Sequence, residues 1–414
     1  MTVRNRMCPD AHAEAVMRDL HCAHARFVWN LAVEQHLWWR PGRGSAPGNA
    51  ERMRQLAEAR AAEQWLRDGS SSVQQQALRD FEHELAAFFD PDNPAGRPKF
   101  RSKRGPQGFV IRDSKVRRLS RKWGEVLVPK CGWVRFRWTR PMPGKPCMAR
   151  VTLDRAGRWH VSFPGPQPAV KRKPSGTAVG IDRGVRTALV TSDGQHYRAP
   201  RISDRDAARY LGLQQQMNRQ RKGSRRREKT RLAMAKITGR VTGRRKDWAE
   251  KISTQLTREH DVIVLERLNT PGMVRRPAPK PNPEQPDAFM PNRACTKAGL
   301  NRGILASCWG LFGRRLEQKA TASGCQVVYV DPRFSSQQCR ACGHTVPENR
   351  NSQAFRCVSC GHTDHADTNA ARNILARGLA LAHGKPVPAR ARGQAGVSPR
   401  KTGKPAAGTT RSAA

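Results

Sequence analysis

The sequence has few acidic residues and no long apolar run. Asp and Glu together number 33 against 77 Lys and Arg, so the formal net charge is +44 over 414 residues. No stretch approaches the roughly 18 apolar residues of a membrane-spanning helix, and no secretion signal is recognisable. A compact protein with this much like charge is destabilised by self-repulsion unless it has a polyanionic partner. We therefore expect nucleic acid as the partner, ahead of an anionic membrane surface, and a merely basic soluble protein is the weakest interpretation.

The cysteine pattern gives no sign of a disulfide framework. Eleven cysteines are present, an odd number. Seven of them are scattered without paired spacing: Cys8, Cys22, Cys131, Cys147, Cys295, Cys308 and Cys325. Together with the missing secretion signal, this pattern predicts a reducing compartment, the bacterial cytoplasm.

The other four cysteines form two Cys-x-x-Cys pairs. These are Cys339 with Cys342 and Cys357 with Cys360. Two such pairs can supply a tetrahedral thiolate shell, which is typical of structural Zn²⁺ and leaves no ligand position open for catalysis. Three histidines lie nearby, and we expect them at the surface or against nucleic acid because four thiolates already suffice: His344, His362 and His365.

The pattern of apolar residues changes twice along the chain. Helical spacing covers 9–40, 50–68 and 71–90, and short β-rich runs separated by Gly or Pro cover 107–166. The remainder alternates apolar strands with helices, which predicts an α/β domain. Its expected elements are strands at 178–182, 261–268 and 325–331, helix over most of 205–259, helix over 303–324, and a helix after the cysteine pairs.

Three acids follow apolar strands or begin a helix in that α/β region. Asp182 ends "AVGID", Glu266 ends "VIVLE", and Asp367 begins the helix just after the cysteine pairs. Each acid alone is at least as compatible with a solvated strand end or a helix N-cap. Parallel sheets, however, place functional groups at the carboxyl ends of their strands. Together the three carboxylates could therefore hold two Mg²⁺ ions for phosphodiester hydrolysis.

A basic run between these acids favours nucleic-acid binding. Residues 219–246 contain a single acid, Glu228, among many Lys and Arg, and their spacing is helical. We expect this segment to follow a phosphate backbone, which positions nucleic acid without specifying its sequence. The candidate phosphate contacts are Arg219, Arg221, Lys222, Arg225, Arg226, Arg227, Arg244 and Arg245.

Several segments in order resemble the TnpB/OrfB proteins of insertion sequences, relatives of the compact type V CRISPR effectors. The matching segments are "CAHARFVWNLAVEQ", "ALRDFEHELAAFF", "GRPKFRSK", "GIDRGV", "VIVLERLNTPGM", the four cysteines and "HADTNAARNI". The likeness covers roughly residues 8–380. Arg267 departs from the family, which often has an acid there, and the first ten residues lack the aromatics usual in its first strand.

The resemblance implies an α+β multidomain fold. An N-terminal β-barrel would carry an inserted helical domain, and an RNase H-like (RuvC) nuclease domain would carry an inserted zinc ribbon. The implied boundaries are 1–10 and 91–170 for the wedge-like barrel, 11–90 for the helical domain, 171–177 for a linker, 178–335 with 362–383 for the nuclease, 336–361 for the ribbon, and 384–414 for a disordered basic tail.

The resemblance also implies an activity. The chain would be a transposon-encoded, RNA-guided DNA endonuclease with Asp182, Glu266 and Asp367 as catalytic Mg²⁺ ligands. Its partners would be a guide RNA from the transposon end and double-stranded target DNA, with no membrane and no small-molecule substrate. Two alternatives stay open: a DNA-strand transposase using the same acids, and a zinc-ribbon regulator that binds nucleic acid without cleaving it. Guide RNA that co-purifies with the protein would argue against the transposase.

Overall fold

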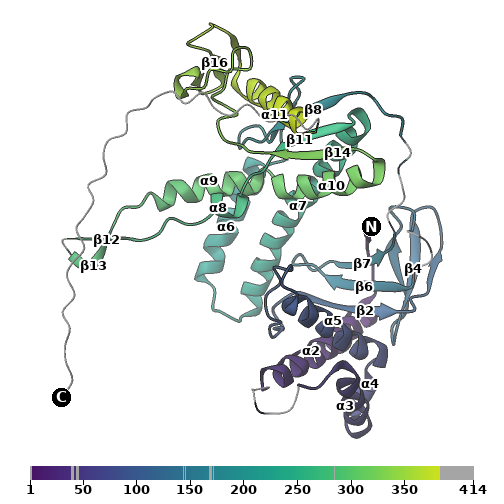
Figure 1. Ribbon diagram of the computed structural model, residues 1–414. Coiled ribbons are helices and arrows are strands. Elements are labelled where there is room, and N and C mark those ends of the chain that lie inside the picture. Colours follow the sequence, from purple (N-terminus) through teal and green to yellow (C-terminus); the bar gives the residue numbers. More distant parts are fainter. Residues whose placement is uncertain are drawn as a thin grey trace, which may run out of the picture.

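A computed structural model describes residues 2–38, 42, 46–142, 144, 146–166, 170, 172–283 and 285–382. The expected tail at 384–414 lies outside these residues. The chain forms two bodies joined near residue 170, one built from the N-terminal helices and strands and one from the α/β region (Figure 1). Among the described residues, no helix is long and apolar enough to cross a membrane.

The N-terminal helices match the expected segments with two interruptions. The first segment is α1 (Ala11–Ala15), a π-helical turn η1 (Val16–His21) and α2 (Cys22–Leu37) rather than one helix. The second is α3 (Asn49–Ala62) and α4 (Gln64–Asp68), and the third is α5 (Ser71–Phe89). Helices α2 and α5 pack side by side, with Trp29 and Phe81 both buried between them.

The expected strands form two open sheets rather than a closed barrel. One sheet has the order β1-β7-β6-β2 and the other β3-β4-β5. The strands are β1 (Thr2–Arg6), β2 (Gln107–Arg112), β3 (Val116–Arg118), β4 (Trp123–Val128), β5 (Gly132–Arg137), β6 (Met148–Leu153) and β7 (Trp159–Pro164). The barrel prediction is wrong among the described residues because β5 reaches the end of β1 through one bridge, Met7 with Phe136, instead of a full ladder. The first strand does form despite its lack of aromatics, since β1 pairs with β7 along its whole length.

A five-stranded mixed sheet organises the second body. Its order is β10-β9-β8-β11-β14. Strands β8, β11 and β14 run parallel to one another, β9 pairs antiparallel with β8, and β10 pairs antiparallel with β9. The strands are β8 (Ala178–Asp182), β9 (Leu189–Thr191), β10 (His196–Tyr197), β11 (Val262–Glu266) and β14 (Gln326–Val330). Strand β11 lies between β8 and β14, and its Ile263, Val264 and Leu265 are fully buried, which is why "VIVL" is continuously apolar.

Helices cover both faces of this sheet. On one face lie α7 (Arg225–Glu259) and α10 (Trp309–Ser323), whose Leu256, Phe312 and Leu316 share a core with β8 and β11. On the other face lies α11 (Ala366–Ala382). Helix α11 approaches closely because of Gly180: a Cβ there would lie 2.2 Å from the carbonyl oxygen of Ala371. The glycine of "AVGID" therefore sets the position of the helix that carries Asp367.

Two segments of the second body extend away from the sheet. Helix α6 (Asp204–Arg219) turns back into α7, so the expected helix over 205–259 is a helical hairpin. After β11 come α8 (Thr270–Met273), the β12–β13 hairpin (Lys280–Asn282 and Gln285–Met290) and α9 (Ala294–Ala306), which extend outward from the body (Figure 1). The helix expected at 303–324 is broken at Cys308, which has a positive φ of 62°, into α9 and α10.

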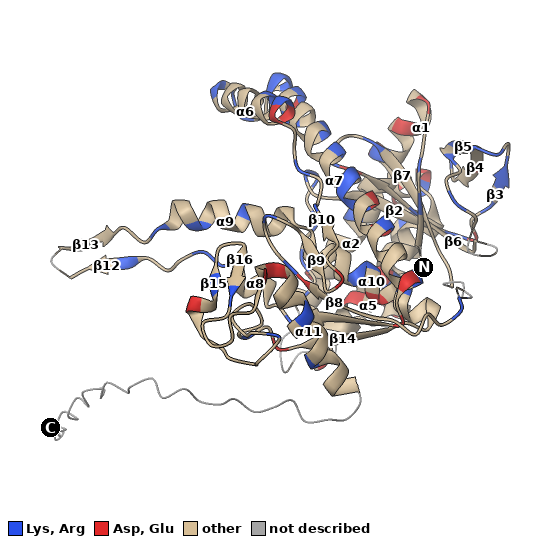
Figure 2. Cartoon of the chain, turned by 90° about the horizontal axis from the view of Figure 1, so that it is seen from above, with Lys and Arg blue, Asp and Glu red and all other residues tan. Residues whose placement is uncertain are grey.

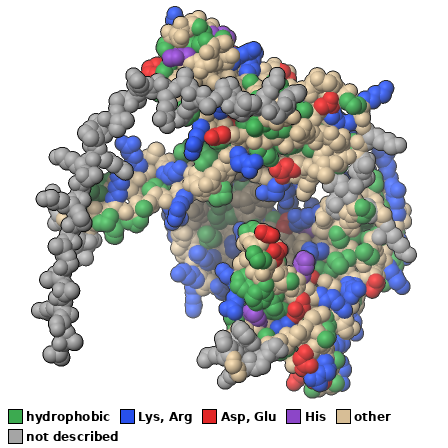
Figure 3. Space-filling model, viewed as in Figure 1, with side chains coloured by type: hydrophobic (Ala, Val, Ile, Leu, Met, Phe, Trp, Pro, Cys, Tyr) green, Lys and Arg blue, Asp and Glu red, His purple; other side chains and the backbone are tan. Residues whose placement is uncertain are grey.

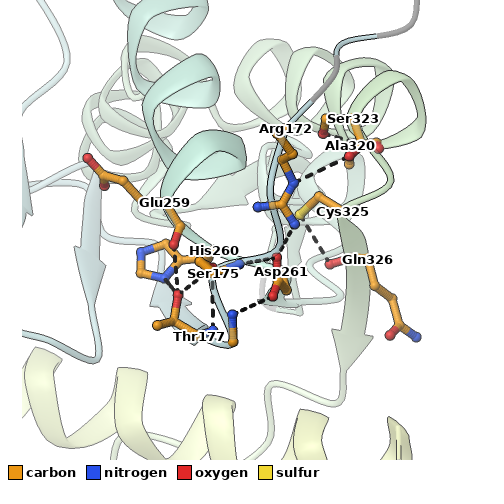
Figure 4. Close-up of polar contacts among 11 residues, drawn as sticks. Arg172, Ser175, Thr177, Glu259, His260, Asp261, Ala320, Ser323, Cys325 and Gln326 are labelled. Carbon is orange, nitrogen blue, oxygen red and sulfur yellow. Dashed lines mark hydrogen bonds and ion pairs between the residues drawn. The ribbon is translucent and has the colours of Figure 1, made fainter.

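The segment expected as a linker is tied to the α/β body. Asp261, at the start of β11, accepts hydrogen bonds from the backbone amides of Ser175 (3.1 Å) and Gly176 (2.6 Å) and pairs with the Arg172 guanidinium (Figure 4). The Thr177 hydroxyl donates to the carbonyl oxygen of Glu259 at 2.7 Å. These contacts join residues 172–177 to the amino end of the sheet, opposite the edge where Asp182 and Glu266 lie.

Candidate functional site

The three acids predicted from the sequence come together at one edge of the mixed sheet. Asp182 is the last residue of β8 and Glu266 the last residue of β11. These strands are parallel neighbours, with Ile181 paired to Leu265, so both acids project at the same carboxyl edge. Asp367 is the second residue of α11, the helix that packs across β8. Three segments distant in sequence therefore place carboxylates beside one another.

The other two acids affect the pKa of Asp182. Burial, followed by the negative charges of Glu266 and Asp367, raises the pKa of Asp182 to about 7. Arg350 opposes this effect. Negative neighbours favour the protonated form of a carboxyl group, because they repel its carboxylate. A bound cation offsets this repulsion and so stabilises the carboxylate.

Glu266 is buried and held by a hydroxyl group. Its Oε1 accepts a hydrogen bond of 2.9 Å from Ser335 Oγ, and both residues are about 5% exposed or less. Burial raises the pKa of Glu266, while the Ser335 hydrogen bond and the nearby Arg183 lower it. Arg183 also donates to the backbone carbonyl of Glu266. Glu266 therefore has a fixed side-chain orientation.

Asp367 is paired with an arginine from the cysteine-containing segment. Arg350 Nη2 lies 2.8 Å from Asp367 Oδ1, and both side chains are partly buried. Arg350 begins β15 (Arg350–Asn351), which pairs with β16 (Ala354–Arg356), which in turn pairs with β17 (Thr363–His365). The cysteine segment thus supplies a cation to the cluster of acids, and no motif in the sequence pointed to it.

Buried amides connect the cysteine segment to the acids. Asn373 Nδ2 donates to the carbonyl oxygens of Ser335 (2.9 Å) and Gln338 (2.7 Å), and Asn369 Nδ2 donates to Gln338 at 2.8 Å. Asn369 Oδ1 also accepts from the Arg340 amide, between the first two cysteines. In the sequence, the indication of this role is the i, i+4 spacing of Asn369 and Asn373, which places both on the helix face that packs against the sheet.

The four predicted cysteines converge. Their sulfur atoms all lie within 4.8 Å of one another, with 3.7 Å between Cys339 and Cys360 and 3.6 Å between Cys342 and Cys357. Each pair is followed by a glycine of positive φ, Gly343 (77°) and Gly361 (73°), where a Cβ would be strained.

The thiols of this cluster are arranged for metal binding. Burial opposes ionisation of the Cys357 thiol, but backbone amides of Cys360 and Ser359 and the neighbouring thiols lower its pKa to about 6. Four convergent sulfurs with one already acidic fit Zn²⁺. Of the three nearby histidines, His344 is exposed, while His362 and His365 are half-buried, so the surface prediction holds fully only for His344.

The three carboxylates do not form a ligand set as compact as that of the cysteines. Among the described residues, the four cysteines are the one group of three or more His, Cys, Asp or Glu arranged to hold a metal ion. Asp367 is paired with Arg350, and Glu266 accepts a hydrogen bond from Ser335. Their oxygen donors suit Mg²⁺, which needs few protein ligands and retains water, so the residues present fit that ion.

The basic residues predicted to bind phosphate lie along the α6–α7 hairpin, where positions of Lys and Arg outnumber those of Asp and Glu (Figure 2). Six of the eight are exposed, whereas Arg227 and Arg245 are half-buried and make internal contacts. Arg227 Nη1 donates to the carbonyl oxygens of Met217 and Gln220, closing the turn between the helices. Arg245 Nε donates to the Pro200 carbonyl at 3.0 Å. Sequence alone predicts Arg227 and Arg245 as phosphate contacts because it cannot distinguish an exposed arginine from one that caps a turn.

Comparison with known proteins identifies the class and then the family. A family model described as "Probable transposase" matches residues 160–276, and one described as "Cas12f1-like, TNB domain" matches residues 309–374. The chain is similar to "Putative RNA-guided DNA endonuclease InsQ" of Escherichia coli, with 34% identity over 77% of each chain. It is also similar to "Putative RNA-guided DNA endonuclease" of Streptomyces pristinaespiralis, with 30% identity over 90% of this chain and 87% of the relative.

These matches span most of the length of both relatives, and the chain belongs to the TnpB/OrfB family. A solved complex of Cas12f1 with guide RNA and target DNA aligns over 87% of this chain and 82% of that one. Its 13% identity and TM-score of 0.48 are too low to carry an argument about this chain.

Proposed function

We propose that the chain is an insertion-sequence-encoded, RNA-guided DNA endonuclease whose partners are a guide RNA and double-stranded target DNA. The observation that carries the proposal is the meeting of Asp182, Glu266 and Asp367 at one sheet edge. It occurs in a chain whose relatives over most of their length are named RNA-guided DNA endonucleases. Base pairing with the guide would select the target, and the protein would recognise duplex shape and a short flanking motif.

The finer fold assignment belongs to the same proposal. A mixed sheet with two acids at the carboxyl ends of parallel neighbours and a third on a covering helix supports an RNase H-like (RuvC) nuclease domain. The segment from Cys339 to Cys360 would be a zinc ribbon inserted between β14 and α11, with Zn²⁺ on its four thiolates. Its role would be to hold Arg350 and the Ser335–Gln338 backbone against the acids.

The residues of the acidic cluster would have distinct tasks. Asp182, Glu266 and Asp367 would hold Mg²⁺, which when bound supplies an activated water and stabilises the departing oxygen. Ser335 and Arg183 would keep Glu266 oriented toward the substrate. Arg350 pairs with Asp367 and would turn toward a scissile phosphate once a metal competes for that carboxylate.

The basic surfaces would hold nucleic acid around the cleavage site. Figure 3 shows a hollow between the two bodies with Lys and Arg along its rim. A duplex would be held there by phosphate contacts from the α6–α7 hairpin, which makes binding depend on salt rather than on sequence.

The test is plasmid cleavage by protein purified with its own RNA. That RNA is sequenced, a matching target with a randomised flank is supplied, and Asp182→Asn, Asp367→Asn and a matched control are compared. The control is Asp331→Asn, because Asp331 follows the neighbouring parallel strand β14 but its side chain is 62% exposed.

We expect Mg²⁺-dependent cleavage by the parent and the control, and none by the two site variants, with RNA retained by all four proteins. Full cleavage by Asp182→Asn would refute the site. RNA-independent strand joining would favour the transposase alternative, and guide-dependent binding without cleavage by the parent would favour the regulator.

A further inference from the structure

A short segment between α5 and β2 holds an aromatic ring out in the solvent. Phe100 lies in this stretch, which has no regular secondary structure, and the residue is 56% exposed. Pro98 is buried and Arg101 half-buried, whereas Lys99 and Phe100 between them are exposed. Isolated exposed apolar residues are common and need no explanation by themselves. The inference therefore depends on how the ring is supported and on what surrounds it.

The backbone on both sides of Phe100 is fixed to α2. Trp29 Nε1 donates to the Lys99 carbonyl at 2.9 Å. The Asn30 side chain makes two hydrogen bonds to Arg101, accepting from its amide at 2.8 Å and donating to its carbonyl at 3.0 Å. The Arg101 guanidinium also stacks on the Trp29 ring, 3.3 Å from its centroid. The backbone on both sides of Phe100 is therefore fixed, while the Phe100 ring is exposed.

The surroundings of the ring are positively charged. Lys99, Lys103 and Arg104 are exposed, and the turn carrying the last two is held by Gln107 Nε2, which donates to the Lys103 carbonyl at 2.7 Å. The pKa of Glu228 is lowered first by its hydrogen bond with Arg231 and further by the charge of Arg104. Arg104 thus acts electrostatically on Glu228, which lies in the first turn of α7.

Two other exposed rings have different surroundings. Trp65 donates to Glu63 at 3.1 Å and packs edge-on against Phe27. Phe89 is 65% exposed, but its ring lies at a tilt to that of Phe88, with the centroids 5.1 Å apart, and Asp90 follows it. Phe100 thus combines an exposed ring, fixed backbone and flanking cations, which is the composition of a stacking site for nucleic acid.

We propose that Phe100 stacks on one unpaired nucleobase of the bound nucleic acid, while Lys99, Lys103 and Arg104 contact the adjoining phosphates. The inference rests on the proposed function, since it assumes a guide RNA and a target DNA. The base has to be unpaired or terminal, because bases inside a duplex have both faces covered by their neighbours. A flat ring recognises any base, so the contact adds affinity and position without sequence preference.

The test uses the cleavage-deficient Asp182→Asn protein, so that binding is measured without turnover. Phe100→Leu removes the aromatic face and keeps an apolar side chain, Phe100→Trp enlarges the face, and Phe89→Leu is the matched control. Guide RNA affinity is measured on RNA-free protein, and target affinity on the guide-loaded complex. We expect Phe100→Leu to weaken one of the two by about 5- to 100-fold, the loss of one base stack, with Phe100→Trp near the parent.

The affected affinity identifies the source of the base. A loss in guide affinity assigns the base to RNA, and a loss confined to the loaded complex assigns it to DNA. The salt slope of the weakened affinity should stay unchanged for Phe100→Leu and should fall by about 0.7–0.9 for Lys103→Ala, since only the second removes a phosphate contact.

Two results would overturn the inference: parental affinities for Phe100→Leu in both assays, or equal losses for Phe100→Leu and Phe100→Trp, which would indicate packing rather than stacking. Either can occur while Asp182→Asn still binds its guide, so this inference can fail without the proposed function failing. Absence of any guide binding in the unsubstituted protein would instead refute the proposed function.

Discussion

Replacing Ser335 with Ala should raise the Mg²⁺ concentration that cleavage requires without disturbing nucleic-acid binding. Ser335 is 4% exposed, and its hydroxyl is the side-chain donor to Glu266, which is 5% exposed. The substitution leaves a buried carboxylate oxygen without that donor. Glu266 would then resist ionisation more strongly, since burial already raises its pKa and the hydroxyl group opposes that effect.

The size of the effect follows from the type of hydrogen bond. A hydrogen bond to a charged group contributes about 1.5–3 kcal/mol, which is roughly 10- to 150-fold in an equilibrium that requires the charged form. Binding of Mg²⁺ by Glu266 is such an equilibrium, because metal ligands bind deprotonated. We therefore expect the Mg²⁺ concentration for half-maximal cleavage to rise by about 10-fold or more, with the rate partly recovered at saturating Mg²⁺.

The assay is the initial rate of guide-dependent cleavage against Mg²⁺ concentration at fixed pH. The matched control is Ser307→Ala, because Ser307 is 3% exposed but its hydroxyl donates to Gly303 within its own helix at 3.0 Å. Guide affinity should be unchanged in both variants. A Ser335→Ala protein with the parental Mg²⁺ midpoint, or a shift matched by Ser307→Ala, would refute the role given to this hydroxyl.

Three further outcomes are expected. In the presence of a metal chelator, Asp182→Asn should be more stable than the parent above pH 7. Folding raises the pKa of Asp182 from 3.8 to about 7, so the parent loses stability as the pH rises through that interval. A pH-independent difference in Tm between the two proteins would contradict this. We expect elemental analysis to find one Zn²⁺ per chain, and Cys357→Ser should release it and lower Tm, unlike serine at an exposed cysteine elsewhere. Arg225→Ala with Arg226→Ala should lower the log-affinity versus log-salt slope by roughly 1.5–2, whereas Arg227→Ala, which loosens the α6–α7 turn, should leave the slope unchanged and reduce stability.

Much of the local structure could be predicted from periodicity and turn residues. The β6–β7 hairpin forms at Asp154–Gly157 because Asp154 Oδ1 accepts the amides of Ala156 (2.8 Å) and Arg158 (2.9 Å). Helix α10 ends at Gly324, whose φ is 70°. Such signals are contained in a few consecutive residues, so they survive in the sequence.

The errors in the fold prediction have long-range causes. The break at Cys308 and the π-helical turn at Val16–His21 lie inside runs with continuous helical spacing, where packing overrides propensity. The open sheets differ from the expected barrel because closure depends on pairing between β1 and β5, and pairing between distant strands has no local signature.

The residue types and their short spacings already define the chemistry available to this protein: four cysteines spaced for one metal, two acids that end apolar strands with a third at a helix start, and an excess of cations for a polyanion. Which of these groups act together depends on the folded structure. Parallel pairing of β8 with β11 brings Asp182 beside Glu266, and the missing Cβ of Gly180 lets α11 bring in Asp367. Ser335 and Arg350 join them through contacts across 69 and 17 residues of chain, which depend on three-dimensional packing and leave no periodic trace in the sequence.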